Sequence, residues 1–195
     1  LLRAVQGLLP VQAGTIFWKG ERVNDLATFF TPPRSAYTPQ APLLFSQPLR
    51  ENILLGLEAD AGGMDDAVKT AVFDQDLADL PQGYETLLGA RGTRLSGGQI
   101  QRAAVARMVV RRPELLIFDD VSSALDVVTE KKLWARIFNT KGWEPTCLVV
   151  SHRPALLQRA DQIVVLKEGQ VDGVGKLDAL LQENEELRQL WHQPS

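Results

Sequence analysis

The sequence contains little cysteine and no long apolar run. Its single cysteine, Cys147, cannot form an internal disulfide, and its place in the apolar stretch 146–150 indicates packing within a buried strand. This use of cysteine fits a reducing compartment such as the cytosol. No apolar stretch approaches the roughly 18 residues that a bilayer-crossing helix needs. Residues 1–7 lack the basic start and the apolar stretch of a signal peptide.

A basic excess is also absent. Lys and Arg number 21 against 24 Asp and Glu, so the net charge is -3, with a pI near 5.5. A protein that binds nucleic acid usually shows a basic excess or a basic stripe, and we therefore expect no nucleic-acid partner. The 195 residues, 45% of them hydrophobic, are typical of one globular domain.

Short apolar runs alternate with helix-compatible segments along most of the chain. This alternation predicts an α/β fold with a parallel sheet flanked by helices. A mostly helical insertion at 42–112 interrupts it, which leaves 1–41 and 113–195 as the α/β core. We expect strands at 14–18, 35–38, 114–118, 147–150 and 162–166, and helices at 1–9, 65–72, 99–110, 125–138, 154–159 and 177–191.

An acidic pair, Asp119-Asp120, follows the continuously apolar run 115–118. Open α/β sheets place ligand groups at the carboxyl ends of their strands. One carboxylate there can help to hold the Mg²⁺ that neutralises phosphates, and its neighbour can activate the attacking water. Taken alone, the pair is a weak signal, because an acidic pair after a strand is more often a simple helix cap.

The pentapeptide Leu95-Ser96-Gly97-Gly98-Gln99 opens a helix, and its last residue lies 20 positions before Asp119. Its glycines let backbone N–H groups approach an anion closely, the serine adds a hydroxyl, and the helix dipole adds partial positive charge. The alternative is a glycine turn capped by serine. The spacing to the acidic strand favours the anion site.

These motifs together resemble the ATPase domain of ABC transporters. The pentapeptide, followed by Gln101-Arg102, is similar to the ABC signature, and 115–119 to the Walker B strand. Residues 122–126, Ser-Ser-Ala-Leu-Asp, resemble the D-loop, and 149–152, Val-Val-Ser-His, the switch-histidine strand. Pro39-Gln40 falls at the Q-loop. The resemblance implies the P-loop NTPase type of fold.

The segments 40–46, 49–56, 80–86 and 89–92 are similar to ABC exporters, in which a membrane domain precedes the ATPase on one polypeptide. Exporters often carry Glu where this sequence has Ala90. The implied location is the cytoplasmic face of the cell membrane. The implied partners are a transmembrane domain and a second ABC ATPase domain.

The resemblance also implies a role for each matching residue. Asp119 would order Mg²⁺ through water, and Gln40 would sense the metal and the γ-phosphate of ATP. Asp120 stands at the catalytic carboxylate, and His152 would contact the γ-phosphate as a switch. Ser96, Gly97, Gly98 and Gln99 would bind the ATP of the second domain, and Asp126 would link the two sites. The other histidine, His192, is expected to be an ordinary surface residue.

Two departures from the family pattern affect these expectations. Asp120 replaces the usual Glu and is one methylene shorter, and a misplacement of that order can cost about 100-fold in rate. The sequence also lacks Gly-x-x-x-x-Gly-Lys-Ser/Thr, because residues 14–20 have the wrong spacing and continue with Glu21. We expect the chain to start just after this Walker A motif, with the first strands missing, and to be inactive by itself.

Three functions remain to be compared. The first is the ATPase domain of an exporter, which couples ATP binding and hydrolysis to transport. The second is a degenerate partner that lends its signature half-site to another domain and catalyses nothing. The third is an ABC-type ATPase acting on DNA or ribosomes, which the exporter-like stretch 45–56 disfavours.

Overall fold

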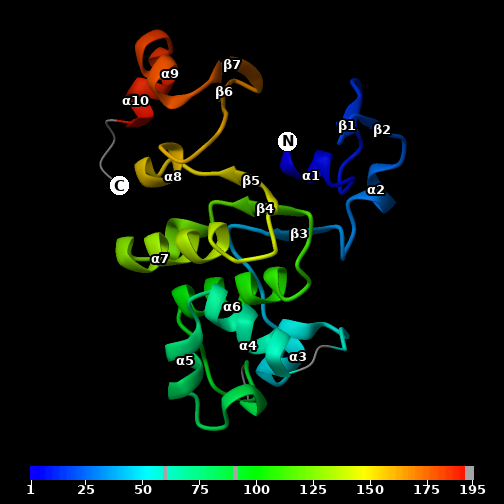
Figure 1. Ribbon diagram of the computed structural model, residues 1–195, viewed down its shortest axis with the longest axis vertical. Coiled ribbons are helices and arrows are strands. Elements are labelled where there is room, and N and C mark those ends of the chain that lie inside the picture. Colours follow the sequence, from blue (N-terminus) through cyan, green and yellow to red (C-terminus); the bar gives the residue numbers. More distant parts are fainter. Residues whose placement is uncertain (59–60, 90–91, 192–195) are drawn as a thin grey trace. The chain divides into compact units, whose positions relative to one another are not determined.

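The computed structural model describes residues 1–58, 61–89 and 92–191 (Figure 1). Ala90 and His192, both considered above, lie outside the described residues. The chain divides into two compact units, residues 1–149 and residues 150–195.

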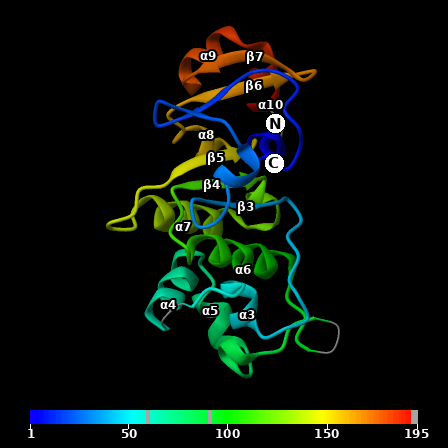
Figure 2. The same ribbon diagram turned by 90° about the vertical axis from the view of Figure 1, so that its right-hand side faces the viewer.

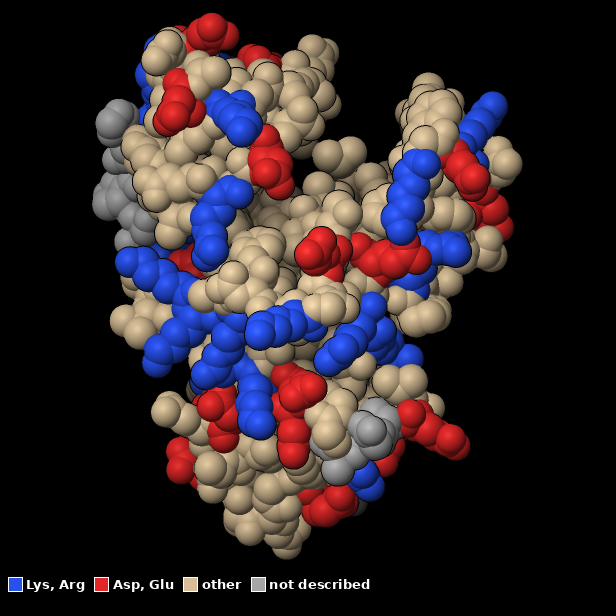
Figure 3. Space-filling view, in the orientation of Figure 1, with Lys and Arg blue, Asp and Glu red and all other residues tan. Residues whose placement is uncertain are grey.

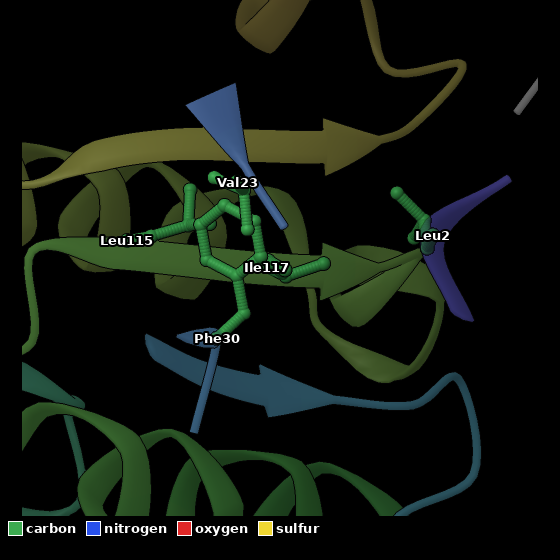
Figure 4. Packing of buried hydrophobic residues seen from close by; sticks show 5 residues of the cluster. All are labelled: Leu2, Val23, Phe30, Leu115 and Ile117. Carbon is green, nitrogen blue, oxygen red and sulfur yellow. The ribbon is translucent and has the colours of Figure 1, made fainter. Parts of the chain in front are cut away.

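The first unit contains a three-stranded sheet with the order β3-β4-β5, formed by Ser35–Thr38, Leu115–Asp119 and Thr146–Val150. Strands β3 and β4 are parallel, and the arrows of all three strands point the same way in Figure 4. Four of the five β4 residues are buried. A continuously apolar strand suits this position because both of its faces are covered.

One face of β4 packs against the N-terminal segments. These are α1 (Leu2–Val5), the antiparallel hairpin of β1 (Ile16–Trp18) and β2 (Glu21–Val23), and α2 (Leu26–Phe29). A buried cluster joins them to the sheet, as Figure 4 shows, and its members are Leu2, Val23, Phe30, Leu115 and Ile117. Because side chains alternate along a strand, Phe118 points the opposite way. Its ring meets Trp134 of α7 (Val127–Phe138) edge to face at 5.1 Å.

Helices occupy the chain between β3 and β4. They are α3 (Leu49–Leu54), α4 (Ala61–Thr70), α5 (Asp74–Asp79), the 3₁₀ turn η1 (Gly83–Glu85) and α6 (Gly97–Val109). Helix α6 packs on α3 and α4 and also on β3, so it lies between the sheet and the other helices (Figure 2). A second 3₁₀ turn, η2 (Val121–Ala124), connects β4 to α7.

Charged side chains connect α7 to the α4–α5 turn. Arg136 of α7 donates to Asp74 Oδ1 at 2.7 Å and also to the Lys69 carbonyl. Lys and Arg side chains gather over α7 in Figure 3, above acidic side chains of the α4–α5 region. Burial raises the pKa of the Asp74 carboxyl, but the hydrogen bond and charge of Arg136, a backbone hydrogen bond and the charge of Lys132 together lower it, and the net pKa is below its usual value. The sequence pattern predicted helices at 65–72 and 125–138, but neither α5 nor this contact.

The second unit is built on an antiparallel hairpin of β6 (Ile163–Lys167) and β7 (Gln170–Gly175), preceded by α8 (Pro154–Leu157). The single helix expected at 177–191 is wrong, because Asn184 divides it into α9 (Leu177–Glu183) and α10 (Glu185–Trp191). The extended backbone of Asn184 ends α9. Its side chain donates to Asp172 and accepts from the Leu187 N–H, which caps α10. None of the described helices is both long and apolar enough to span a bilayer.

Candidate functional site

The N-terminus of α6 carries a complete capping box. The Gln99 amide N–H donates to Ser96 Oγ at 3.3 Å, and the Ser96 N–H donates to Gln99 Oε1 at 2.8 Å. This reciprocal pair fixes the first turn of a 13-residue helix, while Ser96 and Gly97 remain exposed. A hydroxyl that accepts one hydrogen bond can still donate its own proton. The turn therefore offers an anion a hydroxyl, backbone N–H groups and a helix dipole.

Gly98 brings this turn against the segment that follows β4. A Cβ atom at position 98 would stand 3.0 Å from the Ala124 carbonyl oxygen and 3.3 Å from Arg102 Nη1. That spacing is tighter than most side chains tolerate, which explains a glycine at this position. The signature turn and the 122–126 segment of the same chain are therefore neighbours.

An acidic side chain of α5 braces the signature helix. Asp76 accepts from Arg102 Nε at 2.9 Å and Nη2 at 2.8 Å, and from Gln99 Nε2 at 3.1 Å. The side chains of this ion pair are only 14–15% exposed, which strengthens a bidentate contact. Sequence reasoning missed Asp76, because it lies 23 positions before Gln99 and belongs to no motif.

At the carboxyl end of β4, the two aspartates accept hydrogen bonds from different side chains. Asp119 Oδ2 accepts from the Tyr37 hydroxyl of β3 at 3.2 Å. Burial, followed by the Asp119 carboxylate, raises the pKa of Tyr37, although Arg3 opposes the shift. Tyr37 thus remains a protonated donor to Asp119. The sequence suggested the strand of Tyr37 but not its register beside β4.

Asp120 begins the turn η2 in a left-handed backbone conformation, with φ at 51°. Aspartate is among the residues that tolerate this conformation. Its Oδ2 accepts from Gln40 Nε2 at 3.2 Å. Gln101 Nε2 in turn donates to the Gln40 carbonyl at 2.6 Å. The structure therefore brings together Gln40, Asp119 and Asp120, which the sequence analysis had selected, and adds Tyr37 and Gln101.

The carboxylates of Asp119 and Asp120 provide oxygen ligands of the kind that Mg²⁺ prefers. The described residues contain no group of three or more His, Cys, Asp or Glu side chains arranged around one metal position. Mg²⁺ commonly takes one or two carboxylates from a protein and completes its shell with water and substrate phosphates. This donor set fits such an ion and does not form a closed metal cage.

Asp126 caps α7, the helix that follows the 122–126 segment. Its Oδ1 accepts from the Val128 and Thr129 amides at 3.0 and 2.9 Å. Hydrogen bonds from the Thr129 side chain and from these amides hold the pKa of Asp126 below its usual value. His152 belongs to the second unit, where it is exposed between β5 and α8.

The chain matches known proteins along nearly its whole length. Residues 1–123 match the family described as ABC transporter. The uncharacterized ABC transporter ATP-binding protein YfiB of Bacillus subtilis is 35% identical over 192 residues, which cover 98% of this chain and 33% of that protein. The mitochondrial iron-sulfur clusters transporter atm1 of Aspergillus fumigatus is 34% identical over 194 residues, covering 98% of this chain and 27% of that protein.

A solved structure agrees with these sequence matches. The structure of a bacterial Atm1-family ABC exporter with ATP bound superimposes with a TM-score of 0.85 at 30% identity, covering 97% of this chain and 34% of that one. The chain thus spans about a third, or less, of the length of the relatives it matches.

Proposed function

This chain belongs to the ABC transporter family, as an ATP-binding domain of the exporter type, and from that premise we propose that it supplies half of each ATP site in a pair of such domains. The observation that carries the proposal is the exposed and capped N-terminus of α6. Ser96, Gly97, Gly98 and Gln99 would face the γ-phosphate of an ATP held by the second domain. The hydroxyl of Ser96 and the glycine N–H groups would be its donors.

The acidic end of β4 would serve the ATP bound by this chain itself. Asp120 takes a proton from a water molecule while the water oxygen bonds to the γ-phosphorus. The bond from that phosphorus to the bridging oxygen breaks, which gives ADP and phosphate. Gln40 positions Asp120 through the 3.2 Å contact. His152, in the segment that resembles the switch-histidine strand, would contact the γ-phosphate. Asp126 would join the two sites.

Asp119, with Asp120 and Gln40 beside it, would hold Mg²⁺ together with the phosphates. When bound, Mg²⁺ neutralises the charge that develops on the transferred phosphoryl group. Tyr37 keeps Asp119 oriented for this purpose through its hydroxyl.

The helical segment 42–112 is proposed as a subdomain separate from an α/β core of 1–41 and 113–195. Helices α3 to α6 all fall within that segment. The partners of the pair are a second ABC ATPase domain and a transmembrane domain at the cytoplasmic face of the membrane. Because the sequence has no Gly-x-x-x-x-Gly-Lys-Ser/Thr, the chain alone lacks the main cradle for the β- and γ-phosphates and is expected not to hydrolyse ATP.

A degenerate partner that lends only its signature half-site is the second candidate. The short side chain of Asp120 favours it, because a carboxylate one methylene shorter than Glu reaches less far toward the attacking water. If the chain is such a partner, Asp120→Asn would leave ATP hydrolysis by the full-length protein unchanged. Substitutions of Ser96 would still abolish this hydrolysis.

The decisive experiment uses the full-length protein encoded by the reading frame that contains this chain. Magnesium-dependent ATP hydrolysis is measured in membranes for the unsubstituted protein and for Ser96→Arg, Asp120→Asn and Asn139→Arg. We expect the first two to lose hydrolysis. Asn139→Arg introduces the same arginine side chain at the exposed C-terminal end of α7 and should retain hydrolysis. Hydrolysis by the isolated chain that Asp120→Asn abolishes would contradict the proposal.

A further inference from the structure

Gln101 is an amide in an apolar stripe of α6. Helix positions seven apart lie on one face, and Gln101 shares its face with Met108, which accepts from Thr38 of β3. The helix is buried along this side, where it packs on β3. Gln101 itself is 3% exposed. A leucine or methionine would satisfy the burial here, so the amide needs another explanation.

Only half of this amide is satisfied within the described residues. Nε2 donates to the Gln40 carbonyl at 2.6 Å, across 61 positions of sequence. Oε1 is buried and has no hydrogen-bond partner there. A buried acceptor without a donor is destabilising, and this cost offsets what the one hydrogen bond contributes. Gln101 therefore contributes little net stability to the fold. Its specific effect is to hold the Gln40 backbone through one hydrogen bond.

The Gln40 that it holds is in contact with Asp120. The Gln40 side chain donates to Asp120 Oδ2, while its carbonyl accepts from Gln101. Gln40 thus accepts a hydrogen bond from α6 and donates another to the residue that follows β4. Helix α6 also begins with the signature turn, so the same helix carries Ser96 at its start and holds Gln40 from its second turn.

We propose that Gln101 is a positioning residue, which sets Gln40 and through it the Asp120 carboxylate. This rests on the proposed function insofar as Asp120 acts on water. Loss of the Nε2 donor frees the Gln40 backbone, and the amide–carboxylate contact at 3.2 Å loses its support. Chemistry is then affected more than ATP binding, because a displacement of about 1 Å at a reacting group costs up to about 100-fold in rate.

The test compares Gln101→Met with Gln6→Met. Gln6 is also a buried amide whose Nε2 donates to a backbone carbonyl, that of Leu2 at 3.1 Å, and it has no role in the site. In the full-length protein, Gln101→Met should lower kcat by roughly 10- to 100-fold with little change in KM for ATP. Gln6→Met should retain kcat. Equal kcat in the two variants, or a change confined to KM, would overturn the proposal.

A second measurement needs no ATP and uses the 195-residue chain. In nuclear magnetic resonance spectra, Gln101→Met should shift the Ala41 amide and the Asp120 carboxyl carbon, and Gln6→Met should shift neither. Unchanged resonances in Gln101→Met would overturn the proposal. So would unfolding of both Gln101→Met and Gln101→Leu, because Gln101 would then be a structural residue. An inactive unsubstituted full-length protein would instead count against the proposed function and leave this comparison intact.

Discussion

The two ends that define the site, the start of α6 and the end of β4, are held by different kinds of contact. At α6, Ser96 and Gln99 bind one another three positions apart, and a single carboxylate, Asp76, braces the turn from α5. At β4, the supporting hydrogen bonds come from Tyr37 and Gln40, 82 and 80 positions away. The strand itself is buried between two covered faces.

The two ends therefore differ in how much of the fold each one needs to form. The α6 turn can form its donor array with local contacts, because helix caps close within four residues. The β4 carboxylates depend on the whole sheet, since only strand pairing brings Tyr37 of β3 beside Asp119. Loss of core packing should therefore damage the acidic end first, and loss of one capping atom should affect the signature turn only.

The largest expected effect concerns the strand. Phe118 is fully buried against Trp134, and Phe118→Ala should lower the free energy of unfolding by about 3–5 kcal/mol, because it leaves a cavity. Urea unfolding followed by circular dichroism measures the loss. Phe17→Ala serves as the control, because Phe17 is 63% exposed and should lose little. Similar losses for both would show that β4 is not the buried centre of the first unit.

The next effect concerns the brace of the signature turn. Asp76→Ala should cost about 2 kcal/mol, because it leaves the largely buried Arg102 guanidinium without its carboxylate. The matched control is Asp66→Ala, which removes an exposed ion pair with Arg112 at 3.5 Å and should cost below about 0.5 kcal/mol. A double-mutant cycle between Asp76 and Arg102 gives the coupling. A coupling near zero would remove Asp76 from the account of the signature turn.

A smaller loss is expected at the cap itself. Ser96→Ala removes the acceptor for the Gln99 N–H and should cost about 1 kcal/mol. Ser96→Asp restores an acceptor at the helix N-terminus and should recover most of that stability. Denaturant titration of the three proteins tests both statements. If Ser96→Asp were as unstable as Ser96→Ala, the capping hydrogen bond would not be the source of the stability.

The smallest effect depends on pH. Hydrogen bonds from Thr129 and Val128 lower the pKa of Asp126 in the folded chain. Its stabilising contribution is therefore present above the unfolded pKa, about 3.9, and is lost as pH falls through the lower folded value. The melting temperatures of the unsubstituted chain and Asp126→Asn should differ at pH 7 and converge as the pH falls through the lowered folded pKa of Asp126. A difference that stayed constant with pH would exclude ionisation of Asp126 as its cause.

The sequence analysis predicted the α/β fold and the family, because both depend on local patterns. The apolar run 115–118 and the cap Ser96 are visible without tertiary structure, and both are confirmed. Strand pairing and side-chain contacts over long separations are not visible in this way. Tyr37, Asp76 and Gln101 were missed as site residues for that reason. The roles assigned to Gln40, Asp119, Asp120, His152 and Asp126 stay predictions.

The break at Asn184 shows the same limit at a smaller scale. The stretch 177–191 has a helical pattern, but the Asn184 side chain bonds to Asp172 of β7 and caps a new helix. Helix propensity alone does not reveal a partner twelve residues away.

The most direct test of a shared ATP site follows the reactivity of a thiol at the signature turn. In Ser96→Cys, alkylation of the peptide that contains position 96 is measured by mass spectrometry with and without magnesium and ATP. The native Cys147 reacts slowly, because burial raises its pKa to about 12. ATP should slow alkylation at least about tenfold in the full-length protein and leave it unchanged in the isolated chain, where no second domain presents ATP. An equal rate with and without ATP, in a full-length protein shown to bind ATP, would contradict the account.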